Sequence, residues 1–224
     1  MSERSTIRAV LADDHPVFRH GVADLLVTAG GVDIVASVDT GTAAVQAVID
    51  HAPDIVVLDI AMPELNGVSV VRKLVERGSN VKAVMLSVYD SRVYIEQAFE
   101  AGACGYVLKR SAFQNIVQAV RAVSAGGTYF DPSLPSRNAA KYNVSKDGSL
   151  QICKYSLTDR EKDILRYIAF GYTVKEIAAA LNSHVKTIET LKARTCNKIG
   201  ISSRAQIVQF AIIQGWLQGD LSRH

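Results

Sequence analysis

The stretch IVVLD, residues 55–59, places four aliphatic residues in a row and ends on an aspartate. A short, continuously apolar run is typical of a strand that is buried on both faces of a sheet, here over residues 55–58. Comparable runs predict further strands at residues 7–12, 32–37, 82–86 and 106–108. Helical patterns lie between and after the runs, near residues 16–28, 42–51, 68–77, 91–101 and 112–125. This alternation predicts an α/β fold with a doubly wound, five-stranded parallel sheet.

Polar residues stand where four of these strands end. They are Asp13 and Asp14 after the first strand, Asp59 after the third, Ser87 after the fourth and Lys109 after the fifth. Ligands of parallel α/β sheets bind beyond the carboxyl ends of the strands, so these residues are expected at one edge. Any one of the aspartates alone would more often cap a turn or a helix. Clustered carboxylates need a cation, and oxygen ligands select Mg²⁺. The combination therefore predicts a magnesium site at which Lys109 and Ser87 contact a phosphoryl group on Asp59.

The pattern changes in the second half of the chain. Apolar periodicity lapses around residues 131–155, where Ser, Pro, Asn, Gly and Lys are frequent, and we expect an interdomain linker over residues 127–155. Capping-box sequences then begin at Thr158, Thr173 and Ser203. Helices are predicted near residues 159–170, 174–181, 185–199 and 204–214. A small all-α domain is therefore expected over residues 156–217.

Net charge divides the chain near the start of this linker. Residues 1–131 carry a net charge of −4 and residues 132–224 a net charge of +7. Such asymmetry indicates that the C-terminal part alone meets a polyanion, although basic faces that are merely solvated are also common.

The first half resembles the receiver domain of the two-component NarL/FixJ response regulators over residues 5–126, a flavodoxin-like fold. The resemblance rests on LADDHPVFRHG (11–21), LDIAMPELNG (58–67), MLS (85–87) and GYVLK (105–109). It implies that Asp59 is the phosphoacceptor, that Ser87 and Lys109 hold the phosphoryl group and that Tyr106 is an aromatic switch. It also implies that Mg²⁺ is bound by Asp14, Asp59 and the backbone carbonyl of Ala61, with Asp13 acting partly through water.

Two residues next to these motifs bear on the site. Arg110 stands where many receivers have proline after the lysine, which excludes a cis-proline there. His15 follows the acid pair, and we expect it to begin a helix rather than to bind metal.

Residues 157–217 resemble the LuxR-type helix-turn-helix domain, with LTDREKDILRYIAFGYTVKEIAAALNSHVKTIETLKARTCNKIGISSRAQ (157–206) as the matching sequence. The resemblance implies that residues 185–199 form a recognition helix, preceded by a turn at residues 182–184. Three- and four-residue spacing predicts an inward face of Val185, Ile188, Leu191, Thr195 and Ile199. The residues expected to contact DNA are Lys186, Thr187, Glu189, Thr190, Lys192, Arg194 and Lys198. Leu191 replaces a histidine that is frequent in the family, so no family-type contact is expected there.

The sequence thus predicts a response regulator and not an enzyme in the ordinary sense. A partner histidine kinase is expected to phosphorylate Asp59 with Mg²⁺, after which a homodimer binds DNA and regulates transcription. The scattered Cys104, Cys153 and Cys196, with no secretory or membrane segment at the N-terminus, favour the cytoplasm. The alternatives are an orphan regulator that binds DNA without phosphorylation and a helical output domain that binds protein. A small-molecule phosphotransferase is disfavoured, because there is no Gly-rich phosphate loop and Ala61 occupies the position of a second acid.

Overall fold

The computed structural model describes residues 6–134, 142–144, 150–152 and 157–218. Residues 5 and 156, and much of the predicted linker, lie outside the described residues. The chain divides into two compact units.

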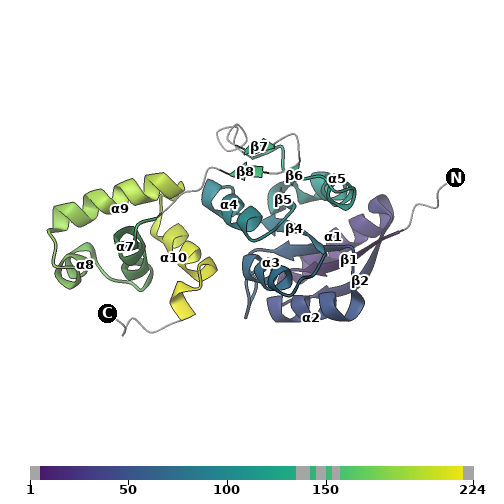
Figure 1. Ribbon diagram of the computed structural model, residues 1–224, viewed down its shortest axis with the longest axis horizontal. Helices are drawn as coiled ribbons and strands as arrows, with labels where there is room; N and C mark the ends of the chain where they lie inside the picture. Colours follow the sequence, from purple (N-terminus) through teal and green to yellow (C-terminus); the bar gives the residue numbers. More distant parts are fainter. Residues whose placement is uncertain (1–5, 135–141, 145–149, 153–156, 219–224) are drawn as a thin grey trace. The chain divides into compact units, whose positions relative to one another are not determined.

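The first unit is built on a parallel sheet in the order β2-β1-β3-β4-β5-β6 (Figure 1). Its strands are β1 (Ile7–Ala12), β2 (Val32–Val38), β3 (Ile55–Asp59), β4 (Lys82–Ser87), β5 (Gly105–Leu108) and β6 (Tyr129–Phe130). The doubly wound α/β fold is confirmed, and five of the strands are those expected. The sixth strand, β6, lies beyond residue 126, where the receiver domain was predicted to end. The sequence analysis did not predict it, because a two-residue edge strand is too short to show a pattern.

Helices alternate with these strands. They are α1 (Pro16–Leu25), α2 (Gly41–His51), α3 (Gly67–Glu76), α4 (Arg92–Glu100) and α5 (Ala112–Ser124). One π turn, Leu26–Gly30, extends α1, and a 3₁₀ turn, Lys109–Ser111, precedes α5. Two further short strands, β7 (Tyr142–Val144) and β8 (Leu150–Ile152), pair antiparallel within the stretch predicted as linker.

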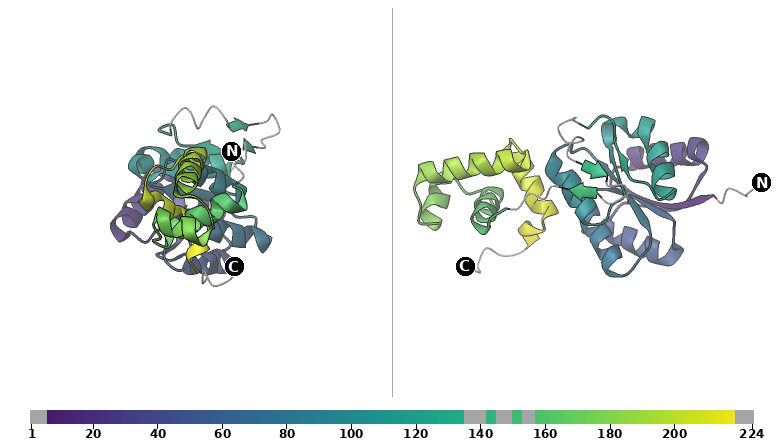
Figure 2. Two further views of the ribbon diagram at one scale, coloured as in Figure 1. Left: turned by 90° about the vertical axis from the view of Figure 1, so that its left-hand side faces the viewer. Right: turned by 45° about the horizontal axis from the view of Figure 1, so that its top comes forward.

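The core of this unit lies on both faces of the sheet. Alternate residues of the strands, such as Leu11, Val57 and Leu86, pack with α1 and α5 in one buried cluster. On the other face α2 and α3 contact each other, and α2 also contacts β1 and β2 (Figure 2). Helix α3 approaches the end of β3 closely at Gly67, where a Cβ atom would lie 2.2 Å from the carbonyl oxygen of Asp59. Only glycine therefore lets α3 begin directly against the end of β3.

In the second unit the described residues form four α-helices: α7 (Asp159–Ala169), α8 (Val174–Ala180), α9 (Val185–Ile199) and α10 (Arg204–Ile213). A short 3₁₀ helix, Trp216–Gln218, follows α10. All three capping boxes are present, at Thr158, Thr173 and Ser203, each with the reciprocal bonds to the third helical residue. A cap of this kind contributes about 1 kcal/mol to helix stability. Buried Ile164, Ile177, Ile188 and Phe210 bring the four helices around one small core.

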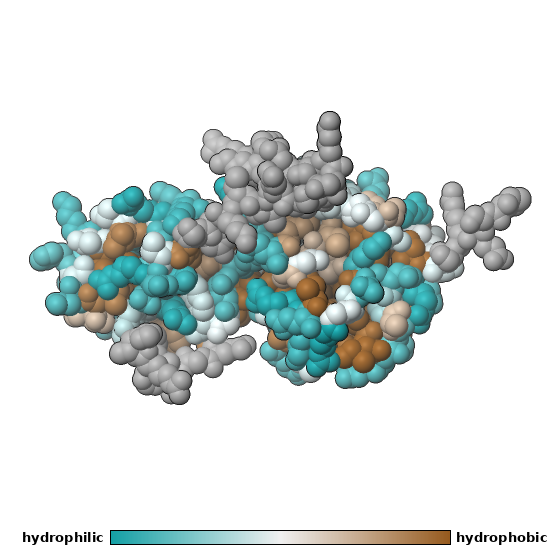
Figure 3. Space-filling model, viewed as in Figure 1, coloured by the Kyte–Doolittle hydropathy of each residue, from teal (hydrophilic) through white to brown (hydrophobic). Residues whose placement is uncertain are grey.

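The described surface that faces the viewer in Figure 3 is mostly hydrophilic, with hydrophobic residues in smaller patches. This distribution is expected when each unit keeps its apolar side chains in a core of its own. Among the described residues, no helix combines the length and apolar character needed to cross a bilayer.

Candidate metal centre and nucleic-acid interface

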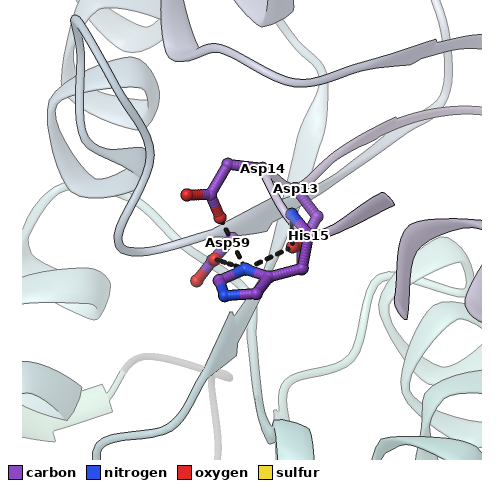
Figure 4. A group of neighbouring side chains, drawn as sticks. All are labelled: Asp13, Asp14, His15 and Asp59. Atoms are coloured by element: carbon purple, nitrogen blue, oxygen red, sulfur yellow. Dashed lines mark hydrogen bonds and ion pairs between the residues drawn. The ribbon is translucent and has the colours of Figure 1, made fainter. Parts of the chain in front are cut away.

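Three carboxylates meet at the carboxyl end of the sheet, as the strand ends predict. Asp13 and Asp14 follow β1, and Asp59 ends β3; the pairing of Ala12 with Leu58 brings these two strand ends together. Oxygens of the three carboxylates and a ring nitrogen of His15 all lie within 4.8 Å of one another (Figure 4). Asp13 and Asp59 are buried, whereas Asp14 is partly exposed. Buried acids this close together repel one another unless cationic groups compensate them.

Lys109 supplies one such cationic group. Its Nζ atom lies 2.6 Å from Oδ2 of Asp59 and 2.7 Å from Oδ2 of Asp13. The side chain is 11% exposed and its ammonium group lies 4.9 Å from the centroid of the Phe18 ring. Burial alone would lower the pKa of Lys109, but its hydrogen bonds to Asp13 and Asp59 outweigh burial, and the pKa is raised. Lys109 is therefore charged at neutral pH.

Asp59 nevertheless binds a proton more readily than an exposed aspartate does. Burial raises the pKa of Asp59 from 3.8 to about 6, against the opposing effect of Lys109. The nearby Asp13 also raises it, and the Ala61 amide, which donates to Oδ1 of Asp59 at 3.1 Å, lowers it. Three carboxylates against one lysine leave the cluster short of positive charge. The donor set is rich in carboxylate oxygens, which suits a hard divalent cation.

Ser87 and Tyr106 meet at the segment that follows β4. Asp59 of β3 pairs with Leu86 of β4, and Ser87 is the next residue of β4. The buried Ser87 hydroxyl accepts a hydrogen bond from the Tyr89 amide at 2.9 Å. Tyr106 is fully buried, and its hydroxyl donates to the Tyr89 carbonyl at 2.8 Å. Both side chains thus bind the backbone of Tyr89, and the Tyr106 ring already points inward.

His15 is the residue that the sequence analysis undervalued. It is the residue before α1, as expected, but its side chain makes no capping hydrogen bond. Instead, Nδ1 lies 2.6 Å from Oδ1 of Asp14 and 3.3 Å from Oδ1 of Asp13. Its position directly after the acid pair was the available signal. The ring joins the cluster because the chain turns into α1 at this point, a turn that spacing alone does not show.

Helix α9 presents a polar face, as predicted. Ile188, Thr195 and Ile199 are buried, whereas Val185, at the first turn, is 39% exposed and Leu191 is half-buried. Of the residues predicted to contact DNA, six are exposed and Lys192 is half-buried; the six are Lys186, Thr187, Glu189, Thr190, Arg194 and Lys198.

Contacts within the second unit distinguish these residues from one another. Lys198 Nζ lies 2.9 Å from Oε2 of Glu161, so this cation already has a partner in α7. The Thr190 hydroxyl donates to the Lys186 carbonyl at 2.9 Å. Among the described residues, Glu189 has no ion pair with Lys186 or Lys192. Its carboxylate is therefore available to an external donor.

Comparisons with known proteins agree with this two-part organisation. Residues 9–121 match the response regulator receiver domain family, and residues 155–211 match the bacterial regulatory proteins of the luxR family. The chain is 32% identical to the transcriptional regulatory protein DegU of Brevibacillus brevis, over 95% of each chain. It is 33% identical to the oxygen regulatory protein NreC of Staphylococcus carnosus, over 92% of this chain and 97% of that one.

Among solved structures, RcsB from Salmonella enterica serovar Typhimurium, bound to a promoter in the presence of a phosphomimetic, has a similar fold. The TM-score is 0.78 at 22% identity, over 94% of this chain and 100% of that one. At this identity the likeness concerns the fold alone.

The raised pKa of Asp59 predicts a pH-dependent stability. Since the folded state holds the Asp59 proton more tightly than the unfolded state, ionisation between about pH 4 and pH 6 costs the folded state free energy. In buffer without divalent cations, Asp59→Asn should therefore raise the free energy of unfolding by about 3 kcal/mol at pH 7.5. The gain should shrink toward zero as the pH falls below 4.

Urea unfolding of both proteins across this range measures the effect, with Asp24→Asn, an exposed aspartate of α1, as the control. A gain of equal size at pH 4 and pH 7.5 would contradict the assignment to burial of the charge.

Proposed function

Because the chain belongs to the response regulators that join a receiver domain to a LuxR-type DNA-binding domain, we propose that phosphorylation of Asp59 controls its activity as a transcription regulator. A partner histidine kinase donates the phosphoryl group, and the phosphorylated protein binds DNA as a homodimer in the cytoplasm. The observation that carries the proposal is the position of the Asp59 carboxylate, buried at a strand end and held by Lys109.

The site has the parts that phosphoryl transfer to a carboxylate requires. An Asp59 oxygen forms a bond to phosphorus while the bond from phosphorus to the donor breaks, and the donor leaves with its electron pair. Lys109 stabilises the negative charge of the transferred group, and the Ser87 hydroxyl donates a hydrogen bond to a phosphoryl oxygen. The residues that would hold a divalent cation are Asp13, Asp14, Asp59 and the carbonyl of Ala61. Bound there, Mg²⁺ would neutralise charge that the acids and the phosphoryl group share.

The switch uses contacts that are already formed. A phosphoryl group on Asp59 would accept a hydrogen bond from the Ser87 hydroxyl and draw it away from the Tyr89 amide, while Tyr106 holds the Tyr89 carbonyl. Tyr106 is buried in the conformation described, and modification of Asp59 shifts an equilibrium between conformations that the protein already adopts rather than creating a new one. The presence of Lys109, Ser87 and the acid pair favours this mechanism over an orphan regulator.

DNA binding, rather than protein binding, suits the exposed face of α9. Arg194, Lys186 and Lys192 provide cations for phosphates, and Glu189 is free to accept a hydrogen bond from a base. A single recognition helix reads only a few base pairs, so specificity requires two copies. In α10, Ile207 and Ala211 are buried in the unit's core, but Ile212 is 49% exposed and is available for pairing.

Phosphorylation at Asp59 is tested by the intact mass of the protein after incubation with a small phosphodonor and Mg²⁺. The parent and the Asp24→Asn control should gain one phosphoryl group, and Asp59→Asn should gain none. Chelating the cation should abolish the gain, since the acids would then repel the donor. Stable labelling of Asp59→Asn would refute the assignment.

Selection from random DNA separates the roles of Glu189 and Lys192. Glu189→Ala should alter the consensus, because a carboxylate accepts from cytosine N4 and repels phosphate. Lys192→Ala should keep the consensus, weaken binding to all sequences and lower the salt slope by about one unit. Lys73→Ala, which removes an exposed cation from α3 of the other unit, should leave the slope unchanged. If the consensus is the same with Glu189→Ala, this residue does not read bases.

The dimer is tested by sedimentation of the phosphorylated protein with its selected DNA. We expect two protomers on each site, and substitution of the exposed Ile212 by Asp should weaken that assembly through loss of apolar contact and like-charge repulsion. A complex of one protomer per site would contradict the proposal.

A further inference from the structure

Asp131 is a buried carboxylate outside the acidic cluster and outside the segment that matches the receiver family, which ends at residue 121. It directly follows β6 and is 2% exposed. Its two oxygens accept five hydrogen bonds. The donors are Leu108 N at 2.9 Å, Ser111 Oγ at 2.5 Å, Asn115 Nδ2 at 3.2 Å, Ser133 N at 2.8 Å and Ser133 Oγ at 2.6 Å. A carboxylate that accepts five hydrogen bonds is ionised, and these bonds hold the donor residues in place around Asp131.

The position of Asp131 follows from the short length of β6. This strand pairs with β5 only at Gly105 and Tyr106, and the Asp131 amide then donates to the Tyr106 carbonyl. Beyond that point, within the part of the chain that the structure describes, β5 has no neighbouring strand on this side to accept from the Leu108 amide. The Asp131 side chain takes that role and continues the hydrogen bonding of the sheet by one residue.

The same carboxylate also holds the turn that follows β5. The Ser111 hydroxyl lies within hydrogen-bond distance of Asp131 Oδ2 and of the Leu108 carbonyl, 3.2 Å away. Leu108 and Ser111 stand on either side of Lys109 and Arg110, so both ends of this turn are tied to Asp131. Many receivers have proline after the lysine, whereas this chain has Arg110, whose guanidinium donates to the Ser133 carbonyl.

Lys109 depends on the placement of this turn because it contacts residues on distant strands. Neighbouring strands lie about 4.8 Å apart, so β5 is roughly 10 Å from β3, with β4 between them. From β5 the four-carbon side chain passes the end of β4 and ends 2.6 Å from Asp59 and 2.7 Å from Asp13. A shift of the turn by about 1 Å would break these contacts, and misplacement of that size can lower a reaction rate by about 100-fold.

We propose that Asp131 is a positioning residue for phosphoryl transfer at Asp59: it clamps the turn after β5 so that Lys109 reaches the acidic cluster. The part that concerns the reaction rests on the proposed function, whereas the clamp on Lys109 does not. Burial would raise the pKa of Asp131, but the bonds from Ser111, Ser133 and Leu108 lower it, so the clamp is charged at neutral pH.

Two serine variants provide a matched pair. Ser111→Ala and Ser133→Ala each remove one hydroxyl that is bonded to Asp131, but only Ser111 lies on the turn that carries Lys109. Asp131→Ala and the isosteric Asp131→Asn are studied beside them, all in the full chain. If Asp131→Ala fails to fold, the serine pair and Asp131→Asn still decide the question.

The first measurement is acetylation of lysines by acetic anhydride, followed site by site by mass spectrometry. Lys109 is protected in the parent by burial and by its ion pairs. Asp131→Ala and Ser111→Ala should raise its acetylation several-fold, and Ser133→Ala should leave it unchanged. Lys82, whose ammonium group donates to the Ser124 carbonyl at 2.8 Å, reports general loosening of the unit. Unchanged Lys109 acetylation, or an equal rise at Lys82, would overturn the clamp.

The second measurement is the initial rate of phosphoryl gain from a small phosphodonor with Mg²⁺. Asp131→Ala should lower this rate by about 10-fold or more. In a Lys109→Met background the same substitution should have no further effect, because it acts through Lys109. A further loss of similar size in that background would show a merely structural role.

The two measurements separate the inference from the function on which it partly rests. If Lys109 becomes exposed in Asp131→Ala but the parent gains no phosphoryl group, the clamp stands and the proposed function fails. The opposite result is that the parent is phosphorylated on Asp59 and Lys109→Met lowers the rate of phosphorylation, but Asp131→Ala changes neither the acetylation of Lys109 nor that rate. The proposed function then stands and the positioning role is refuted.

Discussion

The pairing of one ammonium group with two buried carboxylates is the constraint on which the receiver unit depends. The Lys109 Nζ atom is 2.6 Å from Oδ2 of Asp59 and 2.7 Å from Oδ2 of Asp13. Removal of Lys109 would leave two buried carboxylates without this cation, and an uncompensated buried charge typically costs about 3–5 kcal/mol. The pairing is incomplete, since the pKa of Asp59 is still raised to about 6 by its burial. The surplus of negative charge makes the cluster suited to a further cation, and an anionic phosphoryl group would need the same compensation.

Several features that are far apart in the sequence keep these groups in place. Parallel pairing of β1 with β3 brings Asp13 to Asp59, and Gly67 lets α3 begin directly against the Asp59 carbonyl. Ser87 and Tyr106 bind the two polar groups of the Tyr89 peptide backbone from different strands. The site is therefore connected, through the backbone of Tyr89, to the segment that leads into α4.

The helix-turn-helix unit depends on a simpler constraint. Its four α-helices are short and surround a small core, so the backbone amides at the helix starts need hydrogen-bond partners. Capping boxes at Thr158, Thr173 and Ser203 satisfy the amides at three helix starts. The capping residue Glu161 also pairs with Lys198, so one predicted phosphate contact has a structural partner within the unit. An exposed pair of this kind is weak and screened by salt, and DNA phosphate can compete with it.

The sequence by itself determined the two-part organisation, five of the six strands of the main sheet and the α-helices that the structure describes in both units. It also determined the gathering of Asp13, Asp14, Asp59 and Lys109. These follow from local periodicity, capping signals and the rule that parallel strands bring their carboxyl ends to one edge. Only the tertiary structure decided that His15 contacts the acid pair, that Tyr106 is buried against Tyr89, that β6 extends the sheet and that Asp131 binds both ends of the Lys109 turn. Each of these depends on how two separate segments pack, and packing distances between segments leave no period or spacing in the sequence.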